Sequence, residues 1–201
     1  VEFGEALDFW RVVGIDRDPA PDSVRADLAD PGRRAAGLAE AVERLGGVDV
    51  LVNVAGVFRE GSILDSGPDD WRPVWVVNLE ASLDLMHRVA GPMADQGFGR
   101  IVSITSVHAR AGRPGCLAYD VSKAGLEAAT RSAAVDLGRR GVLVNAVAPG
   151  FVRTRMSLKP DGSDETDDPE FRDVYVTAGR LPLGRGALPD ELAPAVAFLA
   201  S

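Results

Sequence analysis

"VDVLVNVAG", residues 48–56, is a nearly continuous run of apolar, mostly β-branched residues that ends in a small residue and a glycine. Strands that are apolar throughout, rather than at every second position, occur in parallel sheets buried on both faces. Similar runs recur at residues 10–16, 99–106 and 142–150, with longer helical patterns between them. This alternation predicts an α/β fold in which helices cover both faces of a three-layer, doubly wound parallel sheet.

Four segments have the pattern of helices, at residues 31–47, 68–97, 116–141 and 189–200. The first begins with proline and ends in glycine, which is the usual asymmetry of helix ends. We expect one domain over residues 1–201, because the length suits a single core and no repeat divides the chain. The polar, acidic segment 157–169 is predicted to be a solvated surface loop, with a mobile lid at about 151–187 as the alternative.

Composition excludes several partners. The net charge is −8 and the pI is about 4.8, so we expect neither nucleic acid nor an anionic membrane surface as a partner. No apolar run reaches the roughly 18 residues of a spanning helix, and no basic-then-apolar leader opens the chain. Cys116 is the single cysteine, which allows no internal disulfide and agrees with a cytoplasmic protein.

In doubly wound sheets, ligands bind beyond the carboxyl ends of the strands. The residues predicted at those ends are polar, small or otherwise unusual for their segments, and they would gather along one edge of the sheet. They are Asp16, Asn53, Ala55, Gly56, Ser106, Pro149 and Gly150.

The stretch "ITSVHARAGRPGCLAYDVSK", residues 104–123, adds chemistry to that edge. Tyr119 and Lys123 are four positions apart and share one helix face. An ammonium group beside a phenol favours the phenolate, so Lys123 is expected to lower the pKa of Tyr119. The phenol could then exchange a proton with a carbonyl or alcohol, which Ser106 would hold by a hydrogen bond. Taken singly, each residue also suits a structural role: a strand-end cap, a half-buried aromatic and a surface charge.

The segment "YDVSKAGLEAATRSAAVDL" (119–137), with Ser106 before it, resembles the active-site stretch of the short-chain dehydrogenase/reductase family of Rossmann-fold oxidoreductases. Further stretches resemble the family's other motifs in the same order, with Val54 departing from the usual asparagine. They are "LVNVAG" (51–56), "VVNLEA" (76–81), "VNAVAPGFVRT" (144–154) and "LPLGRGALPDELAPAVAFLAS" (181–201). The resemblance runs from about residue 10 to the end of the chain.

The resemblance implies four catalytic residues. Tyr119 would be the acid/base, Lys123 would lower its pKa and hold the nicotinamide ribose, Ser106 would position the substrate carbonyl, and Asn78 would hold a relay water. For Asn78 the alternative is an amide that satisfies a backbone carbonyl. The remaining residues implied to contact the cofactor are Asp27, Leu28, Asn53, Ala55, Gly56, Pro149, Gly150, Val152 and Thr154. No metal site is expected.

A nicotinamide cofactor is required because none of these side chains can supply a hydride. Asp16 ends a predicted strand, where its carboxylate could bind the adenosine ribose hydroxyls of NAD and repel the 2′-phosphate of NADP. Arg17 follows it and could accept that phosphate. We therefore expect NAD, with NADP as the alternative.

The ends of the chain depart from the family pattern. The family's first strand and its glycine-rich turn would precede residue 1, and "VEFGEALDFW" (1–10) matches only the end of the helix after that turn. The chain also stops before the last strand of the pattern. We therefore expect a partial domain that lacks the first and the last strand, with reduced cofactor affinity.

Two hypotheses for the function follow. The first is an NAD(P)-dependent oxidoreductase that interconverts a small secondary alcohol and a ketone. The second is a non-catalytic Rossmann module that binds a nucleotide or scaffolds a partner. The resemblance implies a homodimer or homotetramer that pairs the helical segments 68–97 and 116–141. Both segments are apolar on more than one face, which fits this pairing, although burial within the domain alone is the alternative.

Overall fold

The computed structural model describes residues 10–201. Five strands belong to it, and all of them pair in parallel. They are β1 (Ile15–Asp16), β2 (Val24–Arg25), β3 (Val50–Asn53), β4 (Gly99–Ile104) and β5 (Val142–Val147).

Helices alternate with these strands along the chain, as the sequence predicts. The α-helices are α1 (Pro31–Leu45), α2 (Pro68–Trp75), α3 (Ala81–Gln96), α4 (Leu117–Leu137), α5 (Pro169–Phe171) and α6 (Pro189–Ala200). A π-helical stretch, Val76–Glu80, joins α2 to α3, so the helix expected at 68–97 forms with an interruption. A second π-helical stretch, Arg172–Thr177, follows α5.

The strands form two separate sheets within residues 10–201. One contains β1 and β2, and the other has the order β3-β4-β5. The regular part of the strand expected at 10–16 is limited to Ile15–Asp16, because β2 is its only described partner. The prediction that the first ten residues match the end of a helix concerns residues 1–9, which lie outside the described part of the chain.

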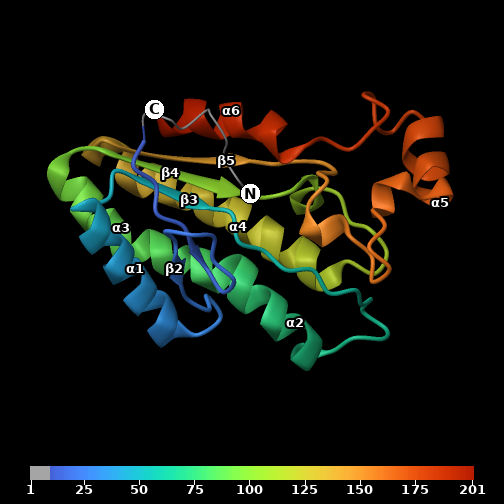
Figure 1. The fold of residues 1–201 in the computed structure, drawn as a ribbon, viewed down its shortest axis with the longest axis horizontal. Coiled ribbons are helices and arrows are strands. Elements are labelled where there is room, and N and C mark those ends of the chain that lie inside the picture. The colour runs from blue at the N-terminus through green and yellow to red at the C-terminus, as the bar shows by residue number, and fades with distance from the viewer. Residues whose placement is uncertain (1–9) are drawn as a thin grey trace.

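Helices cover the three-stranded sheet on both faces (Figure 1). Helix α6 packs on β4 and β5 from one side, while α3 and α4 pack from the other side. Helix α1 lies against β1, β2 and α3. This arrangement confirms the α/β class with a parallel sheet between helical layers.

The main core lies between the three-stranded sheet and α3 and α4. Met93 and Ile101 have no exposed surface, and each fully buried aliphatic side chain stabilises a fold by about 1.5–3 kcal/mol. The buried members of this cluster are Leu38, Leu85, Met86, Val89, Met93, Ile101, Leu126, Val142 and Val144. The core therefore fixes α3 and α4 against one face of the three-stranded sheet.

No described helix is long and apolar enough to cross a membrane.

Candidate active site

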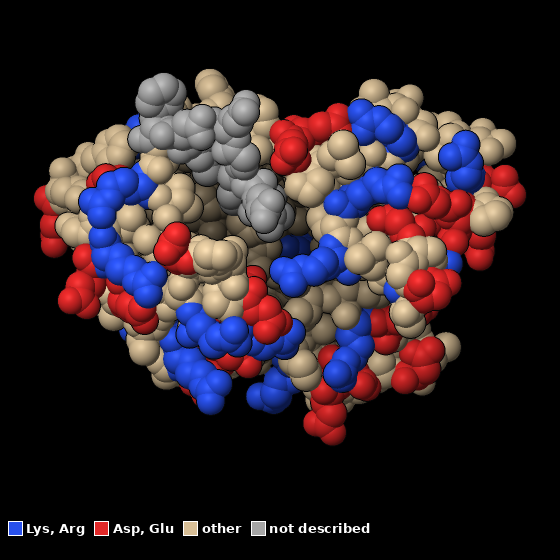
Figure 2. Space-filling view, viewed as in Figure 1, with Lys and Arg blue, Asp and Glu red and all other residues tan. Residues whose placement is uncertain are grey.

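A cavity of about 1200 Å³ runs from the space beside β3, between α1 and α6, to the carboxyl ends of the strands. Figure 2, which has the same orientation as Figure 1, shows a hollow near the middle of the molecule, with acidic and basic side chains on its rim. The cavity brings together most of the residues expected at the site. They are Asp16, Leu28, Asn53, Ala55, Gly56, Ser106, Tyr119, Lys123, Pro149, Gly150, Val152 and Thr154.

Two expected residues are not part of the cavity lining among residues 10–201: Asp27 and Asn78. The Asp27 carboxylate instead accepts a hydrogen bond from the backbone N–H of Ala29 at 2.9 Å, which closes a turn. Asn78 is completely buried.

Asn78 ties the loop after β3 to the helical layer. Its Oδ1 accepts from the Val57 N–H at 2.8 Å, and its Nδ2 donates to the Val57 carbonyl at 2.9 Å and to Ser122 Oγ at 3.1 Å. The Asn78 amide thus satisfies the backbone groups of Val57, which is the structural alternative to holding a relay water. The residue lies in the π-helical stretch Val76–Glu80, where Ala81 N–H bonds to Val76 O. Such stretches often occur at functional sites.

Tyr119 and Lys123 lie in the first two turns of α4. The Lys123 side chain is 3% exposed, and its Nζ donates to the Ile104 carbonyl at 2.8 Å. Nζ lies 5.6 Å from the centroid of the Tyr119 ring. Burial lowers the pKa of Lys123 from 10.5 to about 8, because the charged form loses its hydration.

The pKa of Tyr119 departs from the expectation. Burial raises it above the ordinary value, and the nearby Ser106 hydroxyl only partly offsets this. Lys123 is not among the groups that shift it. In this structure desolvation therefore dominates, and the phenol is protonated at neutral pH.

Ser106 is buried two residues after β4, and its Oγ accepts from the His108 N–H at 3.1 Å. The Tyr119 ring lies between two aromatic neighbours in edge-to-face contact. The ring of Phe58 is 5.6 Å away and the ring of His108 is 5.5 Å away, centroid to centroid. Nothing in the sequence singles out Phe58, which follows the glycine turn after β3 by two residues.

The loop after β3 forms the floor of the cavity next to Lys123. A Cβ atom on Gly56 would lie 3.6 Å from both Lys123 Nζ and Asn78 Oδ1, so this backbone runs close to the site. Asn53 is buried at the end of β3, where its Oδ1 has no hydrogen-bond partner among residues 10–201. A buried amide oxygen without a partner fits a ligand that carries a hydrogen-bond donor.

At the far edge of the cavity, Asp16 ends β1, and its Oδ1 accepts from the Asp18 N–H at 2.9 Å. Arg17 is exposed and forms an ion pair with Asp18 at 3.5 Å. Cys116 is buried in the cavity wall, where burial raises the pKa of its thiol. A thiol in this state is a poor nucleophile.

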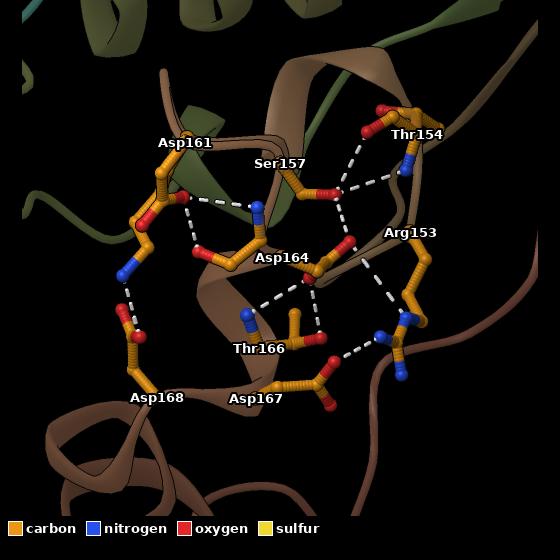
Figure 3. A network of polar contacts seen from close by, with 10 residues as sticks. Arg153, Thr154, Ser157, Asp161, Asp164, Thr166, Asp167 and Asp168 are labelled. Atoms are coloured by element: carbon orange, nitrogen blue, oxygen red, sulfur yellow. Dashed lines mark hydrogen bonds and ion pairs between the residues drawn. The ribbon is translucent and has the colours of Figure 1, made fainter.

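The acidic segment after β5 is ordered by its own hydrogen bonds (Figure 3). The Asp164 carboxylate accepts from Ser157 Oγ and Thr166 Oγ1, both at 2.6 Å, and from the Thr166 N–H at 2.9 Å. Burial acts to raise the pKa of Asp164, but these hydrogen bonds leave it below its ordinary value. Arg153 bridges Asp164 and Asp167, so the segment is a folded unit.

Aromatic residues on either side of the acidic segment form a cluster. The rings of Phe151, Phe171 and Tyr175 lie 4.6–4.8 Å apart between centroids. The guanidinium of Arg113, from the loop before α4, lies over Phe151 at 5.5 Å and over Tyr175 at 5.3 Å. Because Val152 and Glu165 line the cavity, the segment forms one of its walls.

The fold and this site define an α/β protein of the Rossmann-type oxidoreductase class. A family model described as enoyl-(acyl carrier protein) reductase matches residues 11–201. The chain belongs to the short-chain dehydrogenase/reductase family.

Several characterised proteins are similar to this chain. An acetoacetyl-CoA reductase of Allochromatium vinosum is 35% identical over 87% of this chain and 68% of its own length. A 3-oxoacyl-acyl-carrier-protein reductase of Thermotoga maritima is 38% identical over 81% of this chain and 62% of its own length. A 3-alpha-(or 20-beta)-hydroxysteroid dehydrogenase of Mycobacterium tuberculosis is 34% identical over the whole chain and 72% of its own length.

Among solved structures, a gluconate 5-dehydrogenase from Burkholderia cenocepacia, in complex with NADP and tartrate, superposes with a TM-score of 0.83. It is 31% identical, over 94% of this chain and 77% of that protein.

Proposed function

We propose that this protein interconverts a secondary alcohol and a ketone with a nicotinamide cofactor, and that Tyr119 is its acid/base. The observation that carries the proposal is the placement of Tyr119 in the cavity between Ser106 and the buried ammonium of Lys123. A residue set of this kind suits proton transfer to an oxygen atom and has no evident use in a protein that only binds a nucleotide.

The residues present fit a dinucleotide. The cavity has room for it, Asn53 Oδ1 offers a buried acceptor without a partner among residues 10–201, and the Gly56 backbone comes close to Lys123. The residues that would hold it are Asp16, Leu28, Asn53, Ala55, Gly56, Lys123, Pro149, Gly150, Val152 and Thr154. When bound, the nicotinamide exchanges a hydride with the carbon of the substrate.

The chain's own residues then handle the oxygen and its proton. Ser106 donates a hydrogen bond to the substrate oxygen and fixes its distance from Tyr119. In the reductive direction Tyr119 transfers its phenolic proton to that oxygen as negative charge develops, and in the oxidative direction it takes the proton back. Lys123 does not lower the Tyr119 pKa in this structure, but its Nζ lies 5.6 Å from the ring centroid, and we propose that it stabilises the phenolate that forms during turnover. Asn78 keeps the Val57 backbone in place beneath this group.

For the cofactor we propose NAD. Asp16 ends β1 at the edge of the cavity, and a carboxylate there binds ribose hydroxyls and repels a 2′-phosphate. The similar gluconate 5-dehydrogenase holds NADP, so both cofactors belong in the assay. The segment at about 151–187 is proposed as the wall that closes over the substrate, because it supplies Val152, Thr154 and Glu165 to the cavity.

We also propose a homodimer or homotetramer. Leu83 on α3 and Val121 and Val135 on α4 are exposed by 40%, 45% and 82%. Apolar side chains at such positions suit burial against a second copy. Light scattering after gel filtration measures the oligomeric state directly.

Turnover assays test the main proposal. The purified protein is mixed with NAD, NADP or their reduced forms and a panel of secondary alcohols and ketones, while nicotinamide absorbance is followed. We expect turnover of panel members by the wild type and a loss of at least about 100-fold in Tyr119→Phe. Cofactor binding without turnover of any panel member would favour the non-catalytic module instead.

A further inference from the structure

The part of the cavity next to Tyr119 holds a second pair of side chains that the proposed proton transfer does not use. His108 Nδ1 and Asp120 Oδ1 are 2.6 Å apart, and both side chains are largely buried, with 13% and 18% exposed. His108 lines the cavity and its ring meets the Tyr119 ring at 83°. A polar pair at this depth beside the reacting group is in a position to contact the substrate.

The contacts of Asp120 determine which atom of the imidazole is free. Asp120 Oδ2 accepts from the Arg113 N–H at 3.2 Å, and the residue lies in the first turn of α4, where the helix dipole favours a carboxylate. A carboxylate only accepts hydrogen bonds, so Nδ1 of His108 carries a proton and Nε2 is left to a ligand. Within residues 10–201, Nε2 has no hydrogen-bond partner.

The backbone of His108 is fixed as well. Its N–H donates to Ser106 Oγ at 3.1 Å, and residues 107–109 form a short 3₁₀ turn. The imidazole therefore keeps a constant position relative to Ser106 and Tyr119. A substrate group that meets its Nε2 would therefore lie beside the oxygen that Ser106 and Tyr119 are proposed to bind.

Glu165 approaches the same space from the segment after β5. It lines the cavity, it is half-buried, and its carboxylate makes no hydrogen bond or ion pair with the described residues. Burial raises its pKa, while the charges of Arg113 and His108 act in the opposite direction because both lie near it. An unpartnered, half-buried carboxylate suits a hydroxyl donor.

The balance of charge points the same way. Four charged groups act on Cys116 in this part of the wall: the carboxylates of Glu60, Asp120 and Glu165 and the guanidinium of Arg113. A substrate carboxylate would meet more negative than positive charge here, whereas hydroxyl groups can donate to the available acceptors.

Resting on the proposed function, we propose that a second hydroxyl group of the substrate, on the carbon next to the reacting one, donates a hydrogen bond to the Glu165 carboxylate and accepts one from His108 Nε2. The substrate class is then an uncharged vicinal diol or α-hydroxy ketone. His108 touches the substrate in this assignment, and Asp120 is a positioning residue that acts through His108.

A matched pair of substrates tests this inference: cyclohexanol and trans-1,2-cyclohexanediol, which share a ring and differ by one hydroxyl. We expect the wild type to have a kcat/KM about tenfold higher for the diol, as one added hydrogen bond provides. His108→Ala and Glu165→Ala should each remove most of that preference, because they should raise KM for the diol more than they raise KM for cyclohexanol. The variants His108→Gln, Glu165→Gln and Asp120→Asn keep hydrogen-bonding groups, so each should retain part of the preference for the diol.

A second readout does not depend on turnover. The chain has two histidines, so ring-nitrogen NMR with His87→Gln as the assignment control resolves His108. We expect its Nε2 signal to shift on addition of the diol and not of cyclohexanol. Equal kcat/KM values for the two substrates, together with no diol-specific shift of the His108 Nε2 signal, would overturn this inference and leave the proposed function standing. No turnover of any alcohol or ketone in the larger panel would overturn the proposed function, and the inference with it.

Discussion

Lys123 combines an expected functional role with a cost to stability, and its replacement by methionine separates the two. The side chain is buried, and its pKa of about 8 lies well below the 10.5 of a free lysine. Each unit of pKa corresponds to about 1.4 kcal/mol. At neutral pH the buried ammonium therefore lowers the free energy of unfolding by about 3 kcal/mol, relative to a solvated lysine.

The pH dependence has a definite sign. Between the folded pKa of about 8 and the unfolded value of 10.5, the unfolded chain binds more protons than the folded one. The free energy of unfolding consequently rises with pH in this window, by about 2 kcal/mol between about pH 7 and about pH 9.5. Lys123→Met removes the titrating group and with it this component of the slope. Methionine leaves the Ile104 carbonyl without its donor, which partly offsets the gain at neutral pH.

Urea denaturation of the wild type and of Lys123→Met, at about pH 7 and about pH 9.5, measures the effect. We expect Lys123→Met to be inactive and, at about pH 7, to have a free energy of unfolding at least as high as that of the wild type. At about pH 9.5 the wild type should be the more stable of the two. Tyr119→Phe is the matched control, since it removes a catalytic group and keeps the ammonium. An identical pH dependence in wild type and Lys123→Met would refute the reasoning.

Three further substitutions address other parts of the structure. Asn78→Ala leaves both backbone groups of Val57 without their partner and should cost about 2–4 kcal/mol in urea denaturation, whereas Ser122→Ala should cost much less; equal effects would contradict the bridging role. Asp164→Ala should speed hydrogen exchange of the Ser157–Thr166 amides without affecting β4. In the wild type, the stabilisation that the Asp164 carboxylate gives to this segment is present at neutral pH and lost in acid, because its pKa is lowered. Unchanged hydrogen exchange in Asp164→Ala would show that other contacts hold the segment. Asp16→Ala should raise kcat/KM with NADP relative to NAD several-fold, and no change would remove Asp16 from cofactor selection.

The sequence predicts the regular elements well where local signals agree with packing. Helix α1 begins at Pro31 and ends at Leu45, and Gly46 adopts the left-handed conformation (φ 78°) that glycine allows. The apolar runs at 48–56, 99–106 and 142–150 contain β3, β4 and β5, because strands buried on both faces leave an unambiguous pattern.

Other elements depend on contacts that a sequence does not reveal. Strand β2 is two residues long, Val24–Arg25, and exists through its pairing with β1. The π-helical stretch at Val76–Glu80 follows Pro73, but a proline alone does not specify where a helix widens. The acidic segment folds around Asp164 because Arg153, Ser157 and Thr166 converge on it in space.

The candidate site likewise combines residues that the sequence predicts with features that it does not reveal. The strand-end residues Asn53, Gly56, Ser106 and Gly150 could be anticipated from the apolar runs that precede them, whereas Leu28, Val152 and Thr154 are implied only by the family resemblance. The direction of the Tyr119 pKa could not be anticipated, because it depends on the extent of burial and on where Lys123 Nζ points. The turn of Asp27 and the buried bonds of Asn78 likewise depend on local geometry.

The central claim is that the Tyr119 phenol transfers the proton that accompanies hydride transfer. A single-turnover experiment tests it most directly: protein loaded with reduced nicotinamide cofactor is mixed rapidly with a ketone that the wild type turns over, and the loss of nicotinamide fluorescence is recorded. We predict that Tyr119→Phe slows this step by about 10²–10⁴-fold while the affinity for the cofactor stays near that of the wild type. A Tyr119→Phe protein that binds the cofactor and reduces the ketone at the wild-type rate would contradict the account.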